Sequence, residues 1–151
     1  MDASKHSSES HKDLPVWQQS LALAGKVYAA TRSLPSDERF TLDQQLRRSA
    51  LAIASNIAAG WARGTRTAFL LHLHSARGAL LEVDVQTMIA IGQGYIDATS
   101  ELPDDVIELG VQINRLIRTT SGAGQAAHAR ACAPDRLRSR DQSRPSTSSA
   151  S

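Results

Sequence analysis

Residues 47–95 read RRSALAIASNIAAGWARGTRTAFLLHLHSARGALLEVDVQTMIAIGQGY, and this stretch decides the fold. Apolar residues recur at spacings of three and four on both sides of a short break at residues 60–64, and that spacing marks one face of an α-helix. Glycine in the break can adopt the left-handed conformation that ends a helix, and Thr65 can cap the next one. Because the break is so short, it predicts two antiparallel helices joined as a hairpin. The stripe residues are Leu42, Leu46, Ala50, Ile53 and Ile57 before the break, and Phe69, Leu73, Ala76, Leu80, Val83 and Thr87 after it.

One further helix is predicted on each side of the hairpin. Asp13 as a cap and Pro15 in an early helical position mark the start of the first helix. We expect it to end before Pro35, because the residue before a proline is pushed out of the helical region. The fourth helix starts near Pro103, and we expect Gly122 to end it. The stripe of the first helix is Trp17, Leu21, Ala24 and Tyr28, widened by Val16, Leu23 and Val27. The stripe of the fourth is Val106, Leu109, Ile113 and Leu116 with Ile117.

These four helices place a single all-α domain at residues 14–121. Residues 1–13 are polar and without period, which predicts a disordered N-terminal tail. Residues 122–151 carry five arginines against two aspartates among Ala, Ser and Pro, which predicts a disordered basic C-terminal tail.

The composition favours a helical protein of the cytoplasm. The aromatic fraction is only 4%, so the core is expected to consist of Leu, Ile, Val and Ala, which favours helices over strands. The lone cysteine, Cys132, cannot form a disulfide within the chain. No apolar run is long enough to span a membrane, and the first residues lack the apolar stretch of a signal peptide. We therefore expect a cytoplasmic protein with no membrane contact.

Charge is distributed unevenly along the domain. Residues 39–77 hold six arginines and one aspartate, whereas residues 78–121 hold seven acidic residues and two arginines. Two interpretations follow: a basic face for an anionic partner, or opposite charges that meet between neighbouring helices or subunits.

The predicted third helix, from about Arg66 to Ile91, has apolar residues well beyond one stripe. A helix that is apolar over more than about 100° of its circumference needs more than one neighbour. This pattern predicts a homo-oligomer. The additional apolar residues are Leu70, Leu71, Leu81, Val85, Met88 and Ile89.

No catalytic, metal or cofactor site can be assembled from the motifs. His72 and His74 are two residues apart and point to different faces of a helix, whereas a metal pair needs a spacing of three or four. No nucleophile has a base in evident reach, so the sequence predicts a protein that is not an enzyme. Trp17, in register with a core stripe, is predicted to pack in the core. Asn56, beside a core stripe, is predicted to fix helix register.

Residues 14–119 resemble the bacterial protein family encoded within intervening sequences of 23S ribosomal RNA. The residues that carry the resemblance are Val16 and Trp17, Arg47 and Arg48 leading into Ser55–Ala58, Gly60, Gly78 through Glu82 to Gln86, and Gly94 with Tyr95. The resemblance implies an antiparallel up-down-up-down four-helix bundle that assembles as a homopentamer. It also implies kinship with the accessory variability protein of diversity-generating retroelements, a basic barrel that binds reverse transcriptase and nucleic acid. Ala59 stands where the family usually has a glutamate, and the bundle holds a single lysine, Lys26.

Two hypotheses follow for the function. In the first, the protein is an oligomeric accessory scaffold that contacts phosphates of RNA or DNA through Arg47, Arg48, Arg63 and Arg66. In the second, it is a self-assembling structural or protein-interaction module, and its arginines form salt bridges between subunits. Gly60, Gly78 and Glu82 are structural residues in both.

Overall fold

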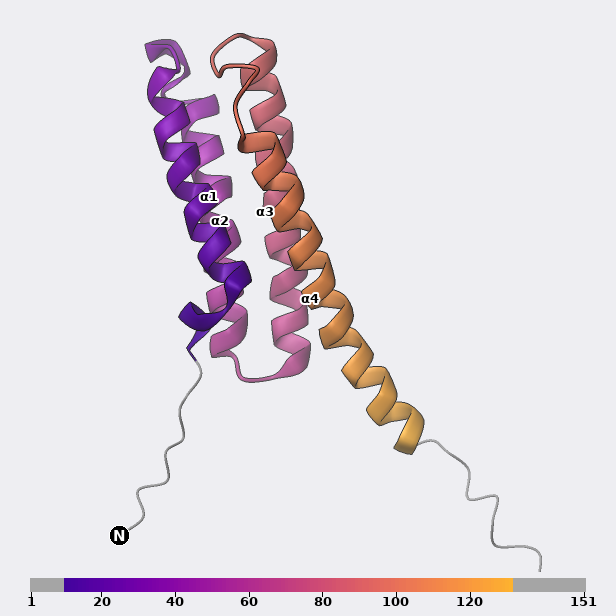
Figure 1. Ribbon diagram of the computed structural model, residues 1–151. Helices are drawn as coiled ribbons and strands as arrows, with labels where there is room; N and C mark the ends of the chain where they lie inside the picture. Colours follow the sequence, from indigo (N-terminus) through magenta and orange to yellow (C-terminus); the bar gives the residue numbers. More distant parts are fainter. Residues whose placement is uncertain (1–9, 132–151) are drawn as a thin grey trace, which may run out of the picture.

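The computed structural model describes the fold of residues 10–131 and the side-chain surroundings of residues 10–122. Four helices follow one another: α1 (Pro15–Ala30), α2 (Leu42–Ala62), α3 (Arg66–Gly92) and α4 (Leu102–Ala131). Three short 3-10 turns precede α1 and connect it to α2: η1 (His11–Asp13), η2 (Thr31–Ser33) and η3 (Ser36–Glu38). Figure 1 shows the helices alternating in direction, and the described residues contain no strand. The predicted all-α, up-down-up-down bundle is confirmed.

The hairpin of α2 and α3 forms as predicted, but Gly64 rather than Gly60 ends α2. α2 continues through Gly60 to Ala62, and Gly64, with φ of 69°, adopts the left-handed conformation that ends the helix. Gly60 is buried inside the helix, and a Cβ atom built there would lie 2.6 Å from the Cβ atom of His72. Gly60 therefore permits close approach of the two helices. Thr65 caps α3 as expected, since its hydroxyl accepts a hydrogen bond of 3.3 Å from the N–H of Ala68.

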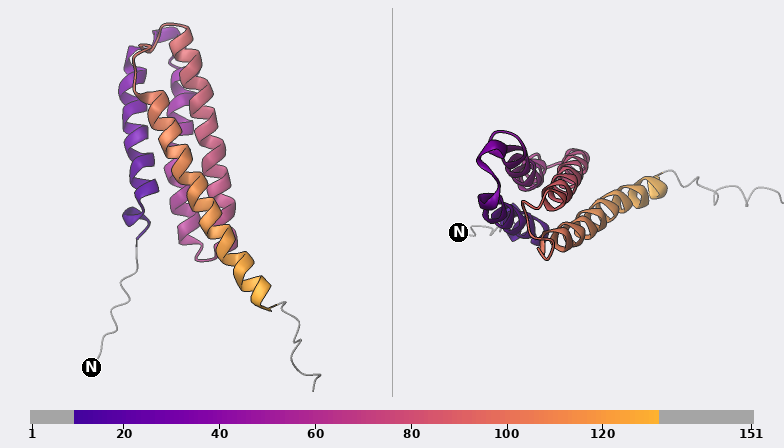
Figure 2. Two further views of the ribbon diagram at one scale, coloured as in Figure 1. Left: turned by 45° about the vertical axis from the view of Figure 1, so that its right-hand side comes forward. Right: turned by 90° about the horizontal axis from the view of Figure 1, so that it is seen from above.

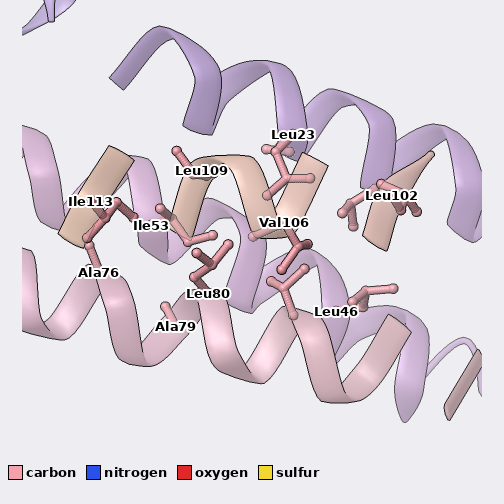
Figure 3. Packing of buried hydrophobic residues seen from close by; sticks show 14 of the residues in the cluster. Leu23, Leu46, Ile53, Ala76, Ala79, Leu80, Leu102, Val106, Leu109 and Ile113 are labelled. Atoms are coloured by element: carbon pink, nitrogen blue, oxygen red, sulfur yellow. The ribbon is translucent and has the colours of Figure 1, made fainter. Parts of the chain in front are cut away.

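The core is a single apolar cluster contributed by all four helices (Figure 3). On α2, α3 and α4 the buried side chains follow the predicted stripes. On α1 the predicted face is partly wrong, because Leu21 and Tyr28 are 49% and 38% exposed. The buried side of α1 includes Ser20, whose hydroxyl donates to the carbonyl of Val16 and so needs no water. The buried residues of α1 are Val16, Ser20, Leu23, Ala24 and Val27.

The two ends of the domain differ from the expected boundaries. Asp13 does not cap α1: it belongs to η1, where it forms a capping box with Ser10. α4 passes Gly122 and continues to Ala131, so the predicted stop is wrong. One glycine costs a helix only about 1 kcal/mol relative to alanine, and the alanine-rich sequence that follows favours helix. The rest of both expected tails, residues 1–9 and 132–151, lies outside the described residues.

α4 crosses the other helices at an angle rather than lying parallel to them. It packs on α3 and α1, and its C-terminal part runs away from the end of the bundle that holds the α2–α3 turn (Figure 2). At that end the aromatic side chains of Trp61 and Phe69 are only partly buried.

Candidate functional site

The outward side of α3 carries more exposed large apolar side chains than any other described helix. Five large side chains there are 49–68% exposed. Residues 71, 74, 78, 81, 85, 88 and 92 follow one another at alternating spacings of three and four, and none is an acid, a lysine or an arginine. A period of 3.5 residues is that of a helix face that packs along another helix. The five side chains are Leu71, Leu81, Val85, Met88 and Ile89.

α4 extends this apolar surface. Arg77 of α3 donates to the side chain of Asn114 at 3.4 Å, and Leu81 follows Arg77 by one turn. Ile107 and Val111 precede Asn114 on the same side of α4 and are 64% and 53% exposed. The antiparallel register therefore places them beside Leu81 and its neighbours. We call these seven side chains the α3–α4 face.

Gly78 and Glu82 lie at or beside this face. Gly78 is exposed, and nothing lies within 4 Å of a Cβ atom built there, so the isolated chain has no steric need for glycine. Glu82 is also exposed, and its carboxylate accepts a hydrogen bond of 2.9 Å from the hydroxyl of Ser49. Glu82 thus joins α3 to α2, whereas no contact among the described residues explains Gly78.

Arg47 contributes to the packing of α1 against α2. Its Nε atom lies 2.6 Å from Oδ1 of Asp43 and donates to the hydroxyl of Thr31 at 2.9 Å. Its guanidinium carbon lies 4.8 Å from the centre of the Tyr28 ring, which is a cation–π contact. The spacing of four between Asp43 and Arg47 was a signal in the sequence for this ion pair.

The predicted set of four arginines does not form one patch. Arg47 and Arg48 both line a groove of about 620 Å³ on the outer side of α2, together with Arg39 and the Phe40 ring, which is 81% exposed. Arg63 follows Arg47 by sixteen residues of helix, which is about 24 Å along the axis. Sequence analysis missed Arg39 and Phe40, because both lie in the connection before α2 rather than on a helix stripe.

Arg66, the first residue of α3, lies near the C-terminal end of α2, beside a second hollow of about 590 Å³. The rings of Trp61 and Phe69 contact each other there edge to face, with their centres 5.8 Å apart. The remaining lining residues are Gly60, Gly64, Thr65, Thr119 and Thr120.

The other predicted structural residues lie between helices. Asn56 donates to the carbonyl of Ala52 at 2.8 Å, and its side-chain oxygen lies 3.3 Å from Nδ1 of His72 on α3. That contact is at the level where Gly60 brings the helices together. Trp17 is partly buried against the core, and its ring contacts His11 at 5.1 Å.

The shifted pKa values belong to surface contacts between elements. A hydrogen bond of 2.7 Å to Asp105 raises the pKa of Lys26 and links α1 to α4. Hydrogen bonds from Thr41 and from Thr99 lower the pKa values of Glu38 and Asp97, respectively. None of these groups lines the groove on α2 or the hollow beside Trp61.

The part of the chain that the structure describes contains neither a cluster of metal ligands nor a helix that could cross a membrane. No three His, Cys, Asp or Glu side chains gather as metal ligands would. Among the described helices, none combines the length and apolar character that crossing a membrane requires.

Comparisons with known proteins agree with the fold. A crystal structure of a protein of unknown function from the S23 ribosomal protein family of Bacteroides thetaiotaomicron is similar, with a TM-score of 0.63 and 22% sequence identity. The match covers 68% of this chain and 97% of that one. No curated protein matches the chain. The model of the 23S rRNA-intervening sequence protein family matches residues 12–117, so the chain belongs to that family.

Proposed function

We propose that the protein is a self-associating helical scaffold in which the α3–α4 face of each copy is covered by a neighbouring copy. The observation that carries the proposal is the extent of this face: seven large apolar side chains on two adjacent helices, each about half or more exposed. Exposed apolar surface of this size on a folded chain marks a site of protein association.

A second copy is the preferred occupant because the seven side chains of the face are all uncharged, and Glu82 beside them already accepts a hydrogen bond from Ser49 of its own chain. Copies of one chain can therefore bring this face into contact without opposing charges, and most soluble oligomers consist of identical chains. Burying a Leu, Ile, Val or Met completely is worth roughly 1.5–3 kcal/mol, so covering each of these half-exposed side chains contributes roughly 1–2 kcal/mol. Five copies, the number that the family resemblance implies, is part of this proposal.

The polar contacts between helices support a scaffold rather than an enzyme. Asn56 with His72, Ser49 with Glu82, and Arg77 with Asn114 each join two helices of the bundle. In this proposal Arg47 has no role between subunits, because Asp43, Thr31 and Tyr28 of its own chain surround its guanidinium.

Sedimentation velocity of Leu81→Glu tests the proposal. A carboxylate in the middle of the covered face would be buried without a partner, which costs several kcal/mol, so the variant is expected to sediment as a monomer. Ala59→Glu is the matched control: it adds the same charge at an exposed position of α2 where the family usually has glutamate, and its mass is expected to equal that of the wild type. Equal masses for Leu81→Glu and wild type would reject this face as the interface.

A second candidate function, contact with RNA or DNA, is favoured by the groove on α2. Arg39 and Arg48 are exposed and form no ion pair with any described residue. Two arginines beside the exposed Phe40 ring combine phosphate contacts with a surface on which a base can stack. Reverse transcriptase remains a predicted partner by analogy only.

Binding of fluorescent RNA across a salt series tests this candidate. Each phosphate contact contributes roughly 0.7–0.9 to the slope of log affinity against log salt. Replacing both Arg39 and Arg48 by alanine is therefore expected to reduce the slope by roughly 1.5. Arg32→Ala, an exposed arginine outside the groove, is the control. A slope that stays at the wild-type value in the double variant would show that the groove does not contact phosphates.

A further inference from the structure

The hollow between the α2–α3 turn and α4 has the volume of a small-molecule site. Its volume of about 590 Å³ lies within the usual range of ligand pockets, roughly 300–1,000 Å³. It exists because α4 runs away from this end of the bundle (Figure 1), so that the last aromatic side chains of the core are left partly exposed. The hollow is separate from the α3–α4 face and from the groove on α2.

The apolar part of the hollow consists of two aromatic rings that lie nearly perpendicular to each other. The planes of Trp61 and Phe69 make an angle of 82°. In this arrangement the edge of one ring meets the face of the other, and both side chains are partly exposed. Stacking of a nucleic-acid base on one aromatic side chain strengthens binding roughly 5- to 150-fold.

The polar part of the hollow favours an anion. Among the described residues that line it, Arg66 is the only charged one, and it forms no ion pair with any of them. Arg66 and Thr67 are also the first two residues of α3, whose opening N–H groups have no acceptor within the helix. Thr65 supplies acceptors only to Ala68 and Phe69, through its hydroxyl and its carbonyl oxygen.

The opposite wall supplies hydroxyl groups. The Thr119 hydroxyl donates its hydrogen to carbonyl oxygens of α4 at 3.0 and 3.2 Å. Its oxygen can therefore still accept a hydrogen bond from a ligand. At the lip, Gly64 has no side chain to obstruct approach to the start of α3.

We propose that this hollow binds an unpaired nucleotide, with its base stacked against Trp61 and Phe69 and its phosphate held by Arg66 and the first N–H groups of α3. Either a free mononucleotide or one unit of a single-stranded nucleic acid supplies this chemistry. The base would stack on the aromatic pair, and the phosphate would bind at the end of the hollow that holds Arg66. Duplex nucleic acid is excluded as a ligand, because its bases are already stacked on one another.

Fluorescence of Trp61 tests the proposal directly, because the chain has only two tryptophans. In a Trp17→Phe background Trp61 is the sole reporter, and AMP is expected to quench it saturably. Adenosine is expected to bind at least about tenfold more weakly, since it lacks the charge that Arg66 pairs with, and inorganic phosphate is expected to leave the emission unchanged. A short single-stranded RNA that quenches where AMP does not would identify the polymer as the source, and the reverse result would identify the free nucleotide.

Arg66→Gln is expected to weaken AMP or single-stranded RNA binding about tenfold, while Arg32→Gln, outside the hollow, leaves binding unchanged. Both positions are exposed, so circular dichroism of the variants should match the wild type. The proposal is overturned if neither ligand quenches Trp61, if adenosine binds as tightly as AMP, or if duplex RNA binds as tightly as single-stranded RNA. None of these outcomes depends on self-association, which is read from the mass.

Discussion

Replacing Gly60 by alanine tests the packing of α2 against α3 most sharply. The added Cβ atom would lie 2.6 Å from Cβ of His72 and 3.1 Å from Cδ2 of Phe69. A Cβ atom moves only with its backbone, so the two helices must separate. Overpacking of this kind costs roughly 1–3 kcal/mol, and separation also lengthens the 3.3 Å contact between Asn56 and His72, which is worth roughly 1 kcal/mol.

Alanine also favours helix over glycine, and this gain partly offsets the cost. The gain is about 1 kcal/mol, so Gly60→Ala is expected to lower the free energy of unfolding by roughly 1–3 kcal/mol. Gly78→Ala is the matched control, because it makes the same chemical change inside a helix where nothing lies within 4 Å. It is expected to raise the free energy of unfolding by roughly 0.5–1 kcal/mol.

Urea denaturation followed by circular dichroism measures both changes. Association would add to apparent stability, so the comparison is best made in the Leu81→Glu background, which is expected to be monomeric. The reasoning about close approach is refuted if Gly60→Ala stabilises the protein as Gly78→Ala does.

Three further predictions follow from polar groups. Arg47→Met removes the cation that pairs with the Asp43 carboxylate, whose side chain is only 12% exposed. It is expected to lower the free energy of unfolding by roughly 2 kcal/mol. Adding Asp43→Asn should recover part of that loss, and no recovery would contradict the ion pair. Thr87→Val is expected to raise the melting temperature, because the Thr87 hydroxyl is buried without a partner among the described residues and removing it is worth roughly 1 kcal/mol. Asp105 raises the pKa of Lys26, so this contact stabilises the protein at pH values below the ordinary lysine pKa of 10.5 and is lost as the pH rises beyond it. The difference in stability between wild type and Lys26→Met should therefore shrink at alkaline pH. A difference that grows would contradict the contact.

The fold was largely predictable because three of its four helices carry uninterrupted apolar stripes. Ile53, Leu80 and Ile113 are each nearly or fully buried, as their spacing indicates. α1 was harder, since its buried side includes a serine that satisfies its own hydroxyl, while Leu21 lies outside the core. A prediction from apolar residues alone therefore placed the buried side of α1 on a face next to the true one.

The candidate sites were less predictable because they depend on contacts between elements. Arg47 and Arg48 are adjacent in the sequence and both line the groove on α2, yet Arg47 pairs with Asp43 of its own chain whereas Arg48 is exposed beside Arg39 and Phe40. The hollow beside Trp61 depends on the direction of α4, which no local spacing specifies. The excess of apolar residues on α3, in contrast, was visible in the sequence and lies on the surface as expected for a helix with a further partner.

The molecular mass of the wild-type chain in solution tests the central claim most directly. One chain has a mass of 16.2 kDa. We predict that sedimentation equilibrium at micromolar concentration gives a whole-number multiple of that mass, and that Leu81→Glu returns it to a single chain. A wild-type protein that stays at the mass of one chain across the accessible concentration range would contradict the account.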